Sequence, residues 1–98
     1  MRIIAKRTLK EFWILYNDSE EQLTEWYHIV SKAEWKTPNE VKLVYPAADN
    51  VGNNRMVFNI CHNKYRLVVV FRYNIGMVYI RFLGTHNEYM KISDIKQI

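Results

Sequence analysis

The sequence contains almost no cysteine: Cys61 is the only one among 98 residues, so no disulfide can form within the chain. Disulfides are typical of oxidising compartments, and a chain without them fits a reducing one. A secretory leader is not expected either, because Arg2, Lys6 and Arg7 interrupt the apolar residues that follow Met1. The longest aliphatic and aromatic run, Leu67 to Phe71, is far too short to span a membrane. We therefore expect a soluble cytoplasmic protein with no membrane partner.

Acidic residues are missing from the second half of the chain. No aspartate or glutamate occurs from Asn50 to Asn87, whereas five cations do: Arg55, Lys64, Arg66, Arg72 and Arg81. The whole chain has a formal net charge of +4 and a pI of about 9.3. A small basic domain often binds an anion, and nucleic acid is the commonest such partner. A soluble domain that happens to be basic is the simpler alternative.

Metal ligands and hydrolase motifs are also scarce. The acid-free stretch offers no carboxylates for Mg²⁺, and three dispersed histidines, His28, His62 and His86, lack the spacing of a zinc site. Cys61 and His62 are adjacent, and adjacent side chains of an extended chain point apart. We therefore expect no metal and no cofactor.

The hydrophobic periodicity predicts an α+β fold and one domain over residues 1–98. Thr8 and Glu11 resemble a capping box that opens a first helix, Asp18 or Ser19 is expected to cap a second, and Thr37-Pro38 to start a short third. The order predicted from the pattern is a strand at 2–5, these helices, a loop at 47–54, strands at 55–60, 64–73 and 77–83, and a helical turn at 87–92. The helices would pack on one face of a C-terminal antiparallel sheet.

Alternation along the predicted strands places the cations on the face away from the helices. The strand at 64–73 turns Tyr65, Leu67, Val69 and Phe71 inward, and thus Lys64, Arg66 and Arg72 outward. In the last strand Val78, Ile80 and Phe82 would face inward, and Tyr79 and Arg81 outward. Cations neutralise phosphates, and bases stack on aromatic rings for about 1–3 kcal/mol each, so this face is suited to single-stranded RNA. An ordinary solvated sheet face has a similar pattern.

The chemistry that these residues permit is RNA cleavage without a metal. The RNA supplies its own nucleophile, the 2′-hydroxyl, and arginines stabilise the charge on the phosphate. Histidine, lysine or tyrosine can remove and return the protons. His86 directly follows the last strand and Tyr89 comes three residues later, although a histidine at a strand end is more often only a surface residue.

Several strings of residues resemble one family. They are Val51-Gly-Asn-Asn-Arg-Met-Val-Phe-Asn-Ile60, Asn63-Lys-Tyr-Arg-Leu-Val-Val69, Val78-Tyr-Ile-Arg-Phe-Leu-Gly-Thr-His-Asn-Glu-Tyr89, and the N-terminal Met1 to Trp13 with Ala33 to Pro38. The chain resembles the HigB toxins of type II toxin–antitoxin systems, which belong to the RelE-like group. It departs from them at Cys61-His62, where a basic residue and glycine are commoner, and at Met90, where aspartate is common.

This resemblance implies an mRNA interferase with a RelE-like fold, an endoribonuclease that cuts mRNA without a metal while it is translated on the ribosome. It also implies a HigA antitoxin, a helix-turn-helix protein through which alone the toxin would meet operator DNA. The residues to which catalytic roles carry over are Lys64, Arg66, Arg81, His86 and Tyr89. The residues expected to bind RNA are Asn54, Arg55, Tyr79 and Lys91.

Two other functions fit the same residues. A binding module would hold RNA or the ribosome on the same basic face and differ only in making no cuts. A protein adaptor would use Trp13, Trp26 and Trp35, which stand at helical spacing or near a helix end and are expected in the core. RNA affinity of an adaptor would hardly depend on salt, whereas each phosphate contact contributes about 0.7 to the log–log slope.

Overall fold

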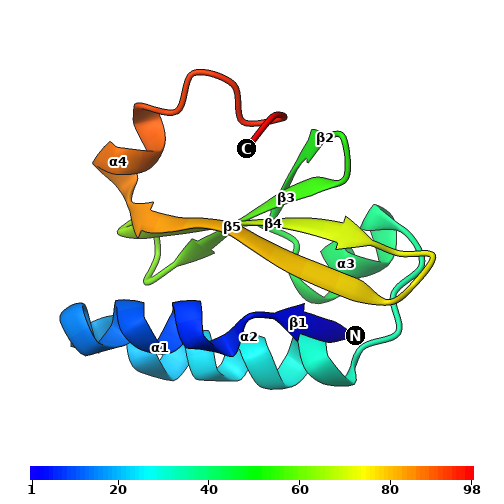
Figure 1. Cartoon of the computed structure of the whole chain (residues 1–98), viewed down its shortest axis with the longest axis horizontal. Coiled ribbons are helices and arrows are strands. Elements are labelled where there is room, and N and C mark those ends of the chain that lie inside the picture. Colours follow the sequence, from blue (N-terminus) through cyan, green and yellow to red (C-terminus); the bar gives the residue numbers. More distant parts are fainter.

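The computed structural model describes all 98 residues and shows helices on both sides of one sheet (Figure 1). The strands are β1 (Arg2–Ile4), β2 (Asp49–Gly52), β3 (Arg55–Ile60), β4 (Tyr65–Arg72) and β5 (Met77–Thr85). The helices are α1 (Lys6–Leu15), α2 (Glu20–Lys32), α3 (Pro38–Val44) and α4 (His86–Met90), with a 3-10 turn, η1 (Asn17–Ser19), between the first two. The predicted α+β class is confirmed. No helix is both long and apolar enough to cross a membrane.

The sheet is larger than the sequence predicted. Its five strands have the order β1-β5-β4-β3-β2, so the expected antiparallel meander of β3, β4 and β5 is extended at both edges. At one edge β1 runs parallel to β5, with Ile3 opposite Val78. At the other, part of the predicted loop at 47–54 forms β2, where Asp49 pairs with Val57. The sheet is therefore mixed rather than purely antiparallel.

Helical spacing located the helices, and their caps were predicted less well. The long helix α2 buries Leu23, Trp26 and Val30, as the pattern predicted. The third start signal is also confirmed, because the Thr37 side chain accepts a hydrogen bond from the backbone N–H of Glu40. The capping box expected at Thr8 does not form, since α1 begins earlier, at Lys6, with Ala5 as its cap.

The core lies between the sheet and helices α1 and α2. As expected, Tyr65, Leu67, Val69 and Phe71 of β4 all belong to its main buried cluster. Phe58 of β3 lies near its centre, where its ring centroid is 5.5 Å from that of Trp26 and 5.2 Å from that of Tyr45. Of the three tryptophans that an adaptor would use, Trp26 and Trp35 are only 1% and 8% exposed, and Trp13 is partly buried against the core.

A register shift in β5 changes one predicted orientation. Ile80 pairs with Val69 and Phe82 with Val68, so Arg81 is an extra residue in this strand. An extra residue reverses the alternation beyond it. Phe82 therefore faces away from α1 and α2, contrary to the prediction, and Leu83 packs against the main core instead.

The face of the sheet away from α1 and α2 is not an open platform. Val57, Val68 and Val70 are only 1%, 0% and 8% exposed there, although they lie outside the main core cluster. Helix α4 and the segment 91–98 lie over this side of the sheet (Figure 1). The segment is fixed at its far end by a hydrogen bond of 3.0 Å from Asn53 Nδ2 to the carbonyl of Lys96. Polar groups thus gather at the ends of the sheet.

Candidate active site

The sequence-predicted site residues lie around two separate hollows. One, here called the arginine hollow, has a volume of about 390 Å³ and is lined by Asn53, Asn54, Arg55, Val70, Arg72, Tyr79 and Arg81. The other, the lysine hollow, has a volume of about 510 Å³ and is lined by Tyr16, Lys64, Tyr65, Thr85, His86 and Asn87. Neither hollow contains the whole set of residues expected to be catalytic.

The two hollows lie far apart along the same strand. Tyr79 lines the arginine hollow and Thr85 the lysine hollow. Arg81 also lines the arginine hollow, so four to six residues of extended chain separate the two hollows, which corresponds to about 13–20 Å. Arg81 therefore shares a hollow with residues expected to bind RNA, and not with His86. One phosphate cannot lie in both hollows.

Backbone pairing brings Lys64 and His86 together in the lysine hollow. The N–H of His86 donates a 3.0 Å hydrogen bond to the carbonyl of Lys64. Helix α4 begins at His86 because Thr85 forms a capping box with Glu88, whose carboxylate accepts from the Thr85 N–H at 2.8 Å. A cap of this kind satisfies two amides that the helix leaves free, so it fixes where His86 lies.

Arg66 and Tyr89 lie at the same end of the sheet. The guanidinium carbon of Arg66 is 5.7 Å from the centroid of the Tyr89 ring. Arg66 is only 9% exposed. Its Nη1 donates to the carbonyl of Asn63 at 3.0 Å, which fixes the guanidinium further. Four of the five residues expected to be catalytic are therefore gathered at one end of the sheet, namely Lys64, Arg66, His86 and Tyr89.

Gly84 stands opposite Arg66 and leaves room for two neighbouring side chains. A Cβ atom at this position would lie 2.6 Å from Cζ of Phe82 and 2.8 Å from Oε1 of Glu88. The glycine thus permits the capping carboxylate of Glu88 to reach Thr85. This close approach gives a physical reason for the string Gly-Thr-His-Asn-Glu-Tyr.

We expect Gly84→Ala to lower the free energy of unfolding by about 1–3 kcal/mol, since an added methyl group in a packed site displaces its neighbours. Urea denaturation followed by circular dichroism measures the change. Combining it with Phe82→Leu should recover part of the stability because the shorter side chain vacates the space. Gly84→Ala with unchanged stability would contradict this account of the glycine.

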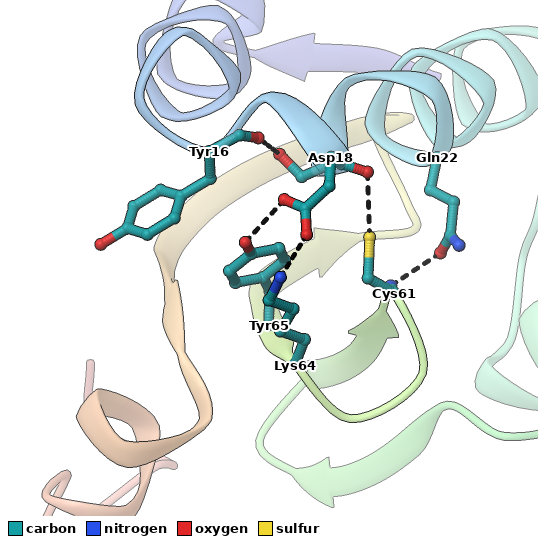
Figure 2. A network of polar contacts seen from close by, with 7 residues as sticks. Tyr16, Asp18, Gln22, Cys61, Lys64 and Tyr65 are labelled. Carbon is teal, nitrogen blue, oxygen red and sulfur yellow. Dashed lines mark hydrogen bonds and ion pairs between the residues drawn. The ribbon is translucent and has the colours of Figure 1, made fainter.

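The electrostatics of the lysine hollow are dominated by Asp18, which lies in η1 (Figure 2). Its carboxylate forms an ion pair with Lys64 and accepts a 2.7 Å hydrogen bond from the Tyr65 hydroxyl. These contacts lower the pKa of Asp18. The hydrogen bond and the charge of Asp18 raise the pKa of Lys64, and burial, with Asp18 next, raises the pKa of Tyr65.

Sequence reasoning missed three residues of the lysine hollow and its rim. Tyr65 was assigned to the core, which it does join, but its hydroxyl also reaches Asp18. Asp18 was considered only as a helix cap, and Tyr16 only as part of a helical stripe. No local pattern connects them with Lys64, because Asp18 is 46 residues away in the chain.

Arg55 already has hydrogen-bond partners in the arginine hollow. Its Nη1 donates to the carbonyl of Asn53 and its Nη2 to that of Ile98, both at 2.8 Å. Its Nε is buried without a partner. Arg72 and Asn53 line the same hollow and were not among the predicted site residues. Lys91, expected to hold a phosphate, is exposed directly after α4.

No group of three or more histidine, cysteine or acidic side chains in the chain is placed to hold a metal ion. The groups that the lysine hollow presents are an ammonium, an imidazole and phenol hydroxyls. Such groups bind phosphate and transfer protons.

Residues 19–92 match the family described as HigB_toxin, the RelE-like toxic component of a toxin-antitoxin system. The chain belongs to the HigB toxin family. The mRNA interferase toxin HigB of Escherichia coli K12 is similar to it, with 30% identity over 91 residues that cover 91% of this chain and 88% of the relative. The mRNA interferase HigB of Escherichia coli O6:H1 is 23% identical over 95 residues, covering 95% and 92%.

The part matched to the HigB toxin family includes both hollows almost entirely. It contains every residue for which the sequence predicted a catalytic or RNA-binding role, from Asn54 to Lys91. Tyr16 and Asp18 precede the matched residues, and the segment 93–98 follows them. The resemblance seen in the sequence is thus confirmed at the level of the family.

Proposed function

We propose that this chain is an mRNA interferase, an endoribonuclease that cuts mRNA during translation on the ribosome and needs no metal ion. The observation that carries the proposal is the pairing of Lys64 with His86 in one hollow. Arg66 and Tyr89 contact each other at the same end of the sheet. The names of the relatives, mRNA interferases, support the kind of reaction. The antitoxin that silences it would be a HigA-type helix-turn-helix protein, through which alone the toxin would meet operator DNA.

In the proposed reaction the 2′-hydroxyl oxygen of one nucleotide attacks the adjacent phosphorus. The bond from phosphorus to the 5′-oxygen of the next nucleotide breaks, leaving a 2′,3′-cyclic phosphate and a 5′-hydroxyl. His86, the proton-transfer group that we assign to this hollow, accepts the proton that leaves the 2′-oxygen and donates it to the 5′-oxygen. Lys64 and Arg66 stabilise the negative charge that develops on the phosphate. Tyr89 stacks against the RNA.

The arginine hollow binds the RNA strand away from the cut. Its cations neutralise phosphates, and Tyr79 offers a ring on which a base can stack. At about 13–20 Å from the lysine hollow along β5, it binds a different part of the strand from the reacting phosphate. Asn54 and Arg55 belong to this binding surface, and Lys91 extends the positive charge next to α4.

The test is the chemistry of the RNA ends after brief induction. Primer extension on cellular transcripts should show new cuts inside reading frames, and the downstream fragments should carry 5′-hydroxyls that polynucleotide kinase labels without prior phosphatase treatment. A 2′-deoxynucleotide at the cut site of a synthetic mRNA, translated in a cell-free system, should abolish cleavage there. Fragments with 5′-phosphates would contradict attack by the 2′-hydroxyl.

The same experiment distinguishes the binding module. A protein that only holds RNA or the ribosome would arrest growth and yield no new RNA ends. Co-expression of a HigA-type antitoxin should remove both arrest and cuts. If the protein cut free RNA at the same sites and rates as translated mRNA, cleavage would not depend on the ribosome, and that part of the proposal would be wrong.

A further inference from the structure

A network of polar contacts ties η1 to the start of β4 (Figure 2). Besides its bonds to Lys64 and Tyr65, Asp18 accepts a 3.2 Å hydrogen bond from the thiol of Cys61 at its backbone carbonyl. The Cys61 N–H donates to the side-chain oxygen of Gln22 at 2.9 Å. The turn before α2 and the segment from Cys61 to Tyr65 therefore hold each other at several points, although they are about forty residues apart.

Stability alone does not explain the Asp18–Lys64 pair. The two side chains are 46% and 61% exposed, and ion pairs that exposed are worth little. The pair instead restricts a side chain that otherwise has many conformations, since lysine carries a flexible four-carbon stem. The Lys64 Nζ is held 5.5 Å from the centroid of the Tyr65 ring, at the edge of the lysine hollow.

We propose that Asp18 is a positioning residue of the active site, which fixes Lys64 as a cationic phosphate ligand and leaves proton transfer to His86. This inference rests on the proposed function and assigns a role within its site. An ammonium has three donor hydrogens. One binds the Asp18 carboxylate, and the others remain for the phosphate of the RNA.

The charged group next to Lys64, the Asp18 carboxylate, favours the protonated form of the lysine. The titratable groups that face it are Asp18 from η1, Tyr65 from β4, Cys61 from the preceding turn, Tyr16 from the end of α1 and His86 from α4. Asp18 raises the pKa of Lys64 above its ordinary value of 10.5. A lysine that acts as a base needs the opposite, a pKa lowered by burial.

The first test compares the cleavage kinetics of Asp18→Asn with the wild type, on an mRNA that the wild type cuts. We expect kcat to fall about 10- to 100-fold with KM changed less than about twofold. A Lys64 ammonium that is out of place stabilises the transition state less, while substrate binding changes little. Asp18→Glu should restore part of kcat. Glu21→Gln is the matched control, since Glu21 is exposed near the same turn and makes no side-chain hydrogen bond or ion pair.

A double-mutant cycle tests whether Asp18 acts through Lys64. In the Lys64→Ala background, Asp18→Asn should cause no further decrease of kcat. An equal decrease in both backgrounds would overturn the proposal, since Asp18 would then act on the fold or on another residue. Urea denaturation of each variant shows whether all of them are folded under the assay conditions.

The second readout needs no RNA. Titration of the Lys64 ε-carbon by NMR should show a lower pKa in Asp18→Asn, nearer to 10.5, and the alkaline loss of cleavage should move to lower pH with it. Equal Lys64 titration in the two proteins would overturn the positioning role even if the wild type cuts RNA. A shifted titration in a wild type that cuts no RNA would instead end the proposed function, and with it any catalytic role for Asp18.

Discussion

His86→Ala should abolish the cuts inside reading frames and relieve growth arrest, with cleavage reduced about 10²–10⁴-fold, the usual contribution of general acid–base catalysis. The fold should be unaffected because the hydrogen bond that places this residue is made by its backbone N–H, which donates to the Lys64 carbonyl and is present in alanine. Primer extension after brief induction of the two proteins measures the cuts. A purified sample of each, unfolded in urea, verifies equal stability.

His28→Ala provides the control for this substitution. His28 is an exposed histidine on α2, and no residue of this helix lines the lysine hollow. Alanine is also well suited to a helix. It should cut as the wild type does. If cuts persist in His86→Ala, the function stands and the proton-transfer role belongs to a tyrosine of the hollow, because Asp18 keeps Lys64 charged.

The sequence was most informative where packing follows a simple period. From Tyr65 to Arg72 both faces of β4 were predicted correctly, since a strand alternates and its inward residues are all large and apolar. Lys64 was predicted to point away from the helices, and this was wrong: it precedes β4 and turns toward Asp18 of η1. The helices followed from the same logic with a longer period. The string from Gly84 to Tyr89 identified the end of the sheet at which the candidate site lies.

The errors all depend on contacts between distant parts of the chain. Phe82 is apolar and alternates correctly, so only the bulge at Arg81 reveals that it points the other way. Asp49 to Gly52 are turn formers by composition and become a strand because β3 offers an edge. Asp18 joins Lys64 only once α2 has packed on the sheet. Tertiary packing decided each of these cases against the local signal.

The separation of the two hollows also changes what the arginines are expected to do. By sequence, Arg66 and Arg81 had the same role, since both lie on the basic strands and both were expected to stabilise the reacting phosphate. In the structure Arg66 is beside Tyr89 and two residues beyond Lys64, whereas Arg81 lines the hollow of Tyr79. Two cations so placed should contribute to different steps.

We therefore expect Arg66→Ala to lower kcat about 10²–10³-fold, as removal of a donor to a developing negative charge does. Arg66→Lys should recover little, because an ammonium lacks the planar fork of the guanidinium. This second variant keeps the charge and most of the stem. Arg66 is 9% exposed and therefore also packs at this end of the sheet. Because Arg66→Lys keeps most of that packing, a low kcat in this variant reports on catalysis.

Arg81→Ala should instead weaken RNA binding and leave kcat within a few-fold of the wild type. Its signature is the salt dependence of the dissociation constant, whose log–log slope should be flatter by about 0.7 because one phosphate is no longer neutralised. Arg72→Ala, in the same hollow, should behave alike. A decrease of kcat in Arg81→Ala as large as that in Arg66→Ala would contradict this division between a catalytic and an RNA-binding arginine. Both arginines would then have to act on the same phosphate.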